Sequence, residues 1–189
     1  MGRTIDAEEF EELYRATARD VLAYVRRRRA GDPDDLVAEV YAVAWRRRPD
    51  LPAPMLRRAW LFGVARTLLK ADGRERRRDR EVVVELAARA EPSADPAGAR
   101  RTTSVVAAAL ARLAPNDREI LQLVSWEGLS PAELAVALGV RPGTARVRLH
   151  RARQALARDP DVRALVEEPE RASIAETPNA PPMPYSWSR

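Results

Sequence analysis

The stretch 129–156 constrains the fold of this chain more than any other part of the sequence. Ser130 and Glu133 have the spacing of a capping box, which starts a helix. Gly139 stands where a helix ends in a left-handed residue, and a second helix is predicted over Pro142–Arg158. Two short helices joined by a tight glycine turn form a helix–turn–helix.

The second of these helices is strongly basic. Six arginines fall between residues 141 and 158, and no acidic residue stands among them until Asp159. Arginine pairs with guanine edges in the major groove, and valine or histidine can touch a thymine methyl. Other arginines on such a helix contact phosphates, which fix the position of the protein on the duplex but do not distinguish one base sequence from another. We predict a DNA-binding helix, the alternative being a solvated helix in an ordinary hairpin. The candidate residues are Arg141, Thr144, Arg146, Val147, Arg148, His150 and Arg151.

The composition narrows the possible functions. The chain has 33 basic and 28 acidic residues and a net charge of +5, which suits a nucleic-acid partner. It has no cysteine and one histidine, which excludes disulfides and makes metal sites and histidine catalysis improbable. We therefore expect no catalytic residue, no metal and no cofactor. No apolar run has transmembrane length and no signal peptide is recognised, so a cytoplasmic protein without membrane insertion is expected.

Helical periodicity recurs along the chain, and no strand pattern stands out. Residues 90–102 are rich in alanine, proline and glycine, which is typical of a linker. We predict an all-α fold with two small helical domains, 1–89 and 103–160, joined by a flexible linker over 90–102. The segment 161–189 contains several prolines and is predicted to be a disordered tail.

The first predicted domain holds a second group of candidate residues. Trp60 and Phe62 lie among arginines, as in proteins that stack melted DNA bases, although aromatic residues at helical spacing are more often core. Asp34, Asp35 and Glu39 lie on one helix. Because no histidine or further ligand accompanies these acids, a solvated or partner-facing patch is favoured over a metal site.

The two groups in this order resemble the small two-domain sigma factors of bacterial RNA polymerase, the extracytoplasmic-function (ECF) type of the sigma-70-like family. The matching segments are LYRATARDVLAYVRRR (13–28), DDLVAEVYAVAWRR (34–47), RAWLFGVARTLL (58–69) and Ala109–Leu156. The resemblance implies a non-enzymatic subunit that directs core polymerase to promoters. It would recognise the −35 element as duplex and melt the −10 element.

The resemblance also assigns residues and partners. Contacts with the core enzyme, through its β′ clamp helices, would come from Asp35, Leu36, Glu39, Val40 and Trp45. The −10 element would be bound by Trp60, Arg66, Thr67, Arg74 and Arg77, and the −35 element by the seven residues named above. The expected partners are core polymerase, including its β flap, promoter DNA and an anti-sigma factor.

Two other functions are compatible with parts of the sequence. A stand-alone helix–turn–helix regulator could use its N-terminal half for dimerisation or ligand sensing, but it would not need the acidic and apolar helix 34–45. A nuclease is disfavoured because no metal-binding group of residues is present.

Overall fold

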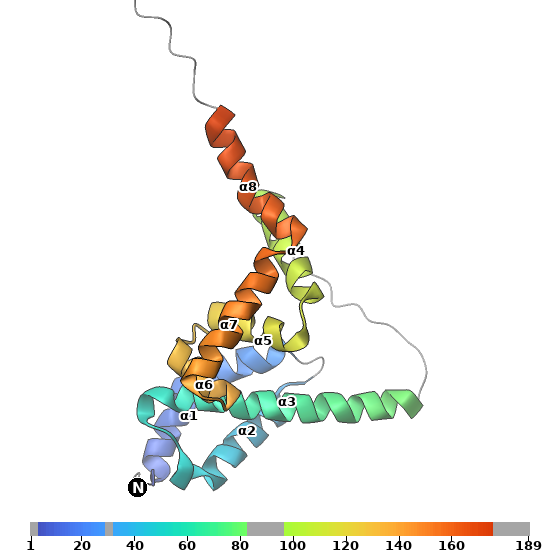
Figure 1. Ribbon diagram of the computed structural model, residues 1–189. Helices are drawn as coiled ribbons and strands as arrows, with labels where there is room; N and C mark the ends of the chain where they lie inside the picture. The colour runs from blue at the N-terminus through green and yellow to red at the C-terminus, as the bar shows by residue number, and fades with distance from the viewer. Residues whose placement is uncertain (1–3, 29–31, 83–96, 176–189) are drawn as a thin grey trace, which may run out of the picture. The chain divides into compact units, whose positions relative to one another are not determined.

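The structure is a computed structural model that describes residues 4–28, 32–82 and 97–175, without the side chains of 75–82, 97–103 and 168–175. Every regular element in these ranges is a helix, which confirms the predicted all-α fold (Figure 1). The helices form two compact units, of which the first joins Met1–Pro92 with Pro115–Ala152 and the second joins Ser93–Ala114 with Arg153–Arg189.

The first unit begins with α1 (Ala7–Arg26), α2 (Asp34–Arg46), the short 3-10 turns η1 (Arg48–Asp50) and η2 (Pro54–Leu56), and α3 (Arg57–Val82). A capping box starts α1, in which the Asp6 side chain accepts from the Glu9 N–H at 3.0 Å. Before α2 the Asp32 carboxylate accepts a hydrogen bond from the Asp34 N–H at 2.9 Å, while Pro33 occupies the N-cap position. Helix α3 continues through Gly73 without interruption.

The core between α1, α2 and α3 consists of side chains with no exposed area, among them Tyr24, Val40 and Phe62. The rings of Tyr24 and Phe62 lie 5.1 Å apart. Phe62 is therefore a core residue, which is the role that helical spacing favours for an aromatic residue, and it offers no exposed face for base stacking. Thr17 and Tyr41 share a buried hydroxyl–hydroxyl hydrogen bond of 2.9 Å.

The same unit contains α5 (Pro115–Ser125), α6 (Pro131–Leu138) and α7 (Pro142–Ala157) as far as Ala152. Helix α6 packs on α3 at Gly63, the position that permits this approach. A Cβ atom at Gly63 would lie 3.0 Å from the Ala137 carbonyl oxygen. Leu123 and Leu134 are fully buried in this part of the unit.

The second unit pairs α4 (Ala97–Arg112) with α8 (Pro160–Ala175). The Arg112 guanidinium donates to Asp159 at 2.8 Å and to Asp161 at 2.7 Å. Asp159 also caps α8, since its carboxylate accepts from the Asp161 N–H at 3.1 Å. These contacts hold the first residues of α8 in place.

Helix α8 corrects one prediction, because residues 161–175 are helical where a disordered tail was expected. The capping aspartate and Pro160 at the first helical position are start signals that the prolines further on obscured. The prolines beyond 175 lie outside the described residues. Likewise α4 begins at Ala97, so the last residues of the predicted linker are helical and the rest lie outside the described residues.

The two units do not follow the predicted domains 1–89 and 103–160. In the structure, α5, α6 and most of α7 belong to the same compact unit as α1–α3. The predicted domains instead followed the order of the sequence. The predicted domain boundaries remain a prediction.

Candidate nucleic-acid interface

Helices α6 and α7 form the helix–turn–helix that the sequence predicts. The Ser130 hydroxyl accepts from the Glu133 N–H at 3.3 Å, and the Glu133 carboxylate accepts from the Ser130 N–H at 2.8 Å. This reciprocal pair is the predicted capping box. Gly139 ends α6 with φ of 64°, a left-handed conformation that glycine adopts without strain.

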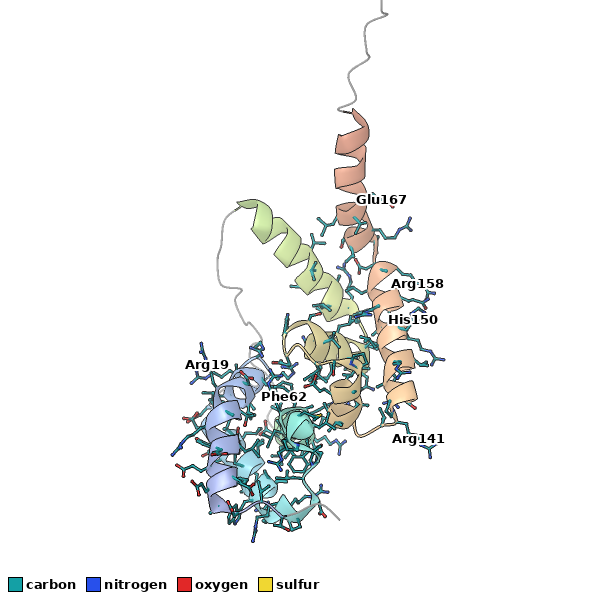
Figure 2. All side chains as sticks on the ribbon, turned by 90° about the vertical axis from the view of Figure 1, so that its left-hand side faces the viewer. Arg19, Phe62, Arg141, His150, Arg158 and Glu167 are labelled. Carbon is teal, nitrogen blue, oxygen red and sulfur yellow. The ribbon has the colours of Figure 1, made fainter. Side chains whose placement is uncertain are left out.

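One face of α7 is buried and the rest is exposed. Ala145, Leu149 and Ala152 are buried, at a helical spacing that fixes which side of α7 faces the unit. Figure 2 shows Arg141 and His150 projecting outward. All predicted DNA-binding residues of this segment are exposed, namely Arg141, Thr144, Arg146, Val147, Arg148, His150 and Arg151. Val147 is 50% exposed, so its methyl groups are accessible on the same face as the arginines.

The predicted −10 residues all lie on α3, in less uniform surroundings. Trp60 is half-buried, and the Arg47 guanidinium lies 5.6 Å from its ring centroid. Thr67 is exposed, and its hydroxyl donates to the Gly63 carbonyl at 2.9 Å. Arg74 is exposed, and the side chain of Arg77 lies outside the described residues.

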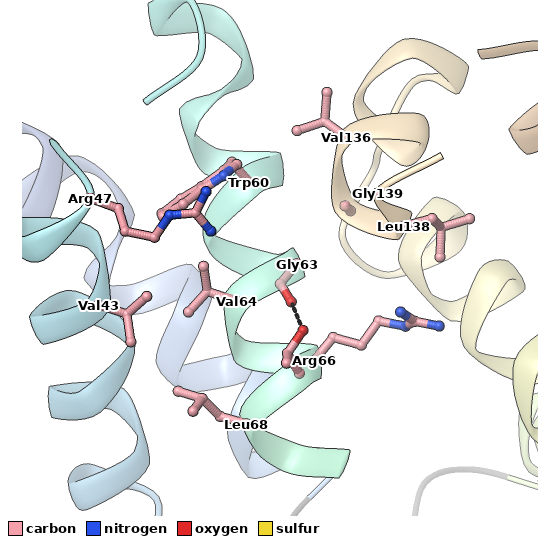
Figure 3. Close-up of a pocket in the computed structure, with 12 residues that line it drawn as sticks. Val43, Arg47, Trp60, Gly63, Val64, Arg66, Leu68, Val136, Leu138 and Gly139 are labelled. Carbon is pink, nitrogen blue, oxygen red and sulfur yellow. Dashed lines mark hydrogen bonds between the residues drawn. The ribbon is translucent and has the colours of Figure 1, made fainter. Parts of the chain in front are cut away.

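A groove of about 280 Å³ runs between α3 and α6 beside Trp60 (Figure 3). Its walls come from α2 at Val43, from the α3 face that carries Gly63 and Thr67, and from α6 at Val136. The structure thus brings Trp60, Arg66 and Thr67 to one groove.

The residues predicted to contact polymerase divide into two groups on α2. Asp35 and Glu39 are exposed, and Trp45 is 39% exposed with its ring 5.0 Å from Phe10. Leu36 is only 7% exposed and Val40 is fully buried. These two side chains form part of the core, so they position α2 and do not present a surface of their own.

An ion-pair cluster that the sequence did not indicate joins α1 to α5 and to the loop after α5. Arg28 donates to Glu119 and to Glu127 at 3.1 Å each, and Arg27 donates to Glu127 at 2.6 Å. The Tyr24 hydroxyl donates to Glu119 at 2.7 Å. Burial and the neighbouring Glu119 carboxylate raise the pKa of Tyr24 above its ordinary range. The partners are separated by 91 to 100 residues, so no local pattern could have revealed them.

The described residues hold no group of three or more histidine, cysteine, aspartate or glutamate side chains that could bind a metal ion. Within the same residues, no helix is both long and apolar enough to cross a lipid bilayer.

The geometry defines a helical protein with an exposed basic helix–turn–helix and a separate acidic helix surface. Comparisons with known proteins agree with this class. Residues 104–156 match the family model "Sigma-70, region 4". The ECF RNA polymerase sigma factor SigL of Mycobacterium tuberculosis is 35% identical over 132 residues, which cover 67% of this chain and 73% of that protein. The RNA polymerase sigma-E factor of Streptomyces coelicolor is 33% identical over 168 residues, which cover 85% and 93%.

The chain belongs to the ECF sigma factors of RNA polymerase. Solved structures agree on the fold. The sigma factor RpoE of Bartonella quintana, in complex with the anti-sigma factor NepR, matches with a TM-score of 0.58 and 22% identity, over 80% of this chain and 96% of that one. CnrH in complex with the cytosolic domain of CnrY matches with a TM-score of 0.51 and 23% identity, over 86% and 90%.

Proposed function

We propose that this chain brings core RNA polymerase to promoters by two DNA contacts, with α7 on duplex DNA at the −35 element and α3 on the melted −10 element. The observation that carries the proposal is the exposed face of α7, which presents arginines, Val147 and His150 without any acidic side chain. The relatives of this chain that were described above are named as RNA polymerase sigma factors.

The side chains on α7 suit base recognition. Arg146 and Arg151 are exposed and can donate two hydrogen bonds to guanine O6 and N7. Val147 and His150 can contact thymine methyl groups, while Arg141 and Arg148 neutralise phosphates. Thr144 lies in the first turn of α7, where a hydroxyl and free N–H groups suit a phosphate oxygen.

The α3 residues suit melted DNA. Trp60 is half-exposed and supplies a stacking face, and Arg47 already lies over its ring. Arg66 and Arg74 supply positive charge along the same helix for a single-stranded backbone. Thr67 can offer its hydroxyl as an acceptor to a base, because its own proton is donated to Gly63.

The surface of α2 formed by Asp35, Glu39 and Trp45 is the proposed contact with core polymerase, at its β′ clamp helices, while α7 would lie near the β flap. It combines two carboxylates with an exposed aromatic ring, as protein interfaces commonly do. This surface separates the proposal from a stand-alone regulator, which would have no use for it. An anti-sigma factor, which the family resemblance suggests, stays a prediction that co-purification would test.

The test is capture of purified core polymerase by the immobilised chain. The variant Asp35→Arg/Glu39→Arg reverses two exposed charges four residues apart on α2 and should lose the complex. The matched control Glu8→Arg/Glu12→Arg reverses two exposed charges with the same spacing on α1 and should retain it. No capture by the wild-type chain, or equal capture by both variants, would refute the proposed contact.

A further inference from the structure

A cleft of about 560 Å³ in the first unit collects positive charge from two helices. Its walls carry Arg66 and Lys70 from α3, and Arg148 and Arg151 from α7. Among the described residues, Asp117 of α5 is the one acidic side chain that lines it. The side chains that face the cleft therefore hold four positive charges against one negative charge.

None of these four cations has an ion-pair partner among the described residues, in contrast to Arg28 and Arg58 nearby. The nearby carboxylate of Glu119 is occupied by Arg28 and by the Tyr24 hydroxyl. The Arg66 Nε–H is buried without an acceptor. A buried donor of this kind usually has a partner, and none is present among the residues that the structure describes.

The like charges affect one another. Burial, together with the charges of Arg66 and Arg74, lowers the pKa of Lys70 from its ordinary value, and the opposing effect of Glu119 does not cancel this. Figure 3 shows the Arg66 side chain extending from α3 toward Leu138, which also lines the cleft. An anion in the cleft would offset the repulsion between these like charges.

We propose that this cleft binds a small compound with two or three adjacent phosphate groups. Three net positive charges match the charge of such a chain, and arginine pairs with phosphate oxygens through two parallel hydrogen bonds. The volume is in the range of small-ligand sites. Ile120 and Leu138 add an apolar wall against which the organic part of a nucleotide can lie.

The binding goes beyond the promoter contacts proposed above and does not depend on them. Its consequence does rest on the proposed function: Arg66 and Arg151 belong to the two DNA-binding sets, so an anion that engages both would compete with promoter DNA.

Isothermal titration of the full chain with inorganic tripolyphosphate at low salt tests the site, with orthophosphate as the weaker comparator. One saturable site is expected, and Lys70→Gln/Arg151→Gln should weaken it by about tenfold or more, since two charge-assisted hydrogen bonds are lost. The control Arg19→Gln/Arg153→Gln removes two exposed arginines outside the cleft and should leave the affinity within about twofold, because distant charges are screened.

A second variant tests the site by a gain of affinity, so that a misfolded protein cannot imitate the expected result. Asp117→Asn removes the one acidic side chain of the cleft at constant size and should tighten tripolyphosphate binding severalfold. Absence of a saturable site, equal weakening by both double variants, or no gain from Asp117→Asn would overturn the proposal. A parallel titration with a short DNA duplex uses Lys70→Gln alone, because Lys70 belongs to neither proposed DNA-binding set. This variant should weaken tripolyphosphate binding and leave duplex binding unchanged, and equal weakening of the two would overturn the proposal.

Discussion

Arg28 donates to Glu127 at 3.1 Å, and this carboxylate side chain is only 3% exposed. The Arg28 side chain is 10% exposed, and its guanidinium lies 3.8 Å from the Tyr24 ring centroid. A guanidinium and a carboxylate withdrawn from water at this depth stabilise the unit only while both are present. The pair therefore ties α1 to the loop after α5.

Removal of one partner should leave a buried charge without compensation. Arg28→Met is expected to lower the free energy of unfolding by about 3–5 kcal/mol, measured by urea denaturation. The exposed pair of Arg15 and Glu11 on α1 is the control, and Arg15→Met should cost at most about 1 kcal/mol. Equal effects of the two substitutions would show that the Arg28 cluster contributes no more than a surface pair.

Gly63 and Gly73 offer a matched comparison within α3. A leucine at Gly63 must displace the Ala137 carbonyl, so Gly63→Leu should destabilise the unit by about 1–3 kcal/mol in urea denaturation. Nothing lies within 4 Å of a Cβ at Gly73, so Gly73→Leu should stabilise by about 0.5–1 kcal/mol through helix propensity. A stabilising effect of Gly63→Leu would contradict the packing of α6 on α3.

The contact of Arg112 with Asp159 makes the start of α8 sensitive to acid. The hydrogen bonds from Arg112 hold the pKa of Asp159 below its ordinary value. Because the folded pKa is depressed, the stabilisation is present above the unfolded pKa of about 4 and is lost as the pH falls through the folded value. Asp159→Asn retains a capping side chain but not the charge.

The stability difference between wild type and Asp159→Asn should accordingly be largest near neutral pH and vanish in acid. Amide hydrogen exchange at Val162 measures it locally, since that N–H is bonded to Asp159 at 3.4 Å. A difference that is independent of pH would exclude the ionic contribution of Arg112.

The arginines of α7 that are proposed to contact bases and those that are proposed to contact phosphates should have different effects on DNA binding by the reconstituted holoenzyme. Arg146→Ala should lose about 1–3 kcal/mol of discrimination at one base pair of the −35 element. Arg148→Ala should weaken all sequences alike and reduce the salt dependence by about one charge. Competition binding with single-base variants over a salt series checks both, and unchanged selectivity in Arg146→Ala would contradict its assignment to bases.

Local signals in the sequence predicted the helix–turn–helix well. The spacing of Ser130 and Glu133 and the position of Gly139 determine the backbone within a few residues. The start and the end of α6 could therefore be predicted from the sequence. The burial of Ala145 and Leu149 then fixes which side chains of α7 face outward, which made the predicted contact set of this helix accessible throughout.

Contacts between distant segments were not predictable. Phe62 is buried although it was considered for stacking, and Leu36 and Val40 are buried although they were assigned to a partner surface. An apolar residue at helical spacing fits a core and an interface equally well, and only the neighbouring helices decide between them. The cluster of Arg28 with Glu119 and Glu127 depends entirely on such long-range packing.

Run-off transcription by purified core polymerase over genomic DNA fragments, with and without this chain, tests whether the chain directs promoter-specific initiation. We expect defined transcripts that require the chain, persist with Glu8→Arg/Glu12→Arg and are lost with Asp35→Arg/Glu39→Arg. Start sites should share one sequence upstream that Arg146→Ala recognises less selectively. Transcription no greater than that of core polymerase alone would show that the chain is not a promoter-specificity subunit.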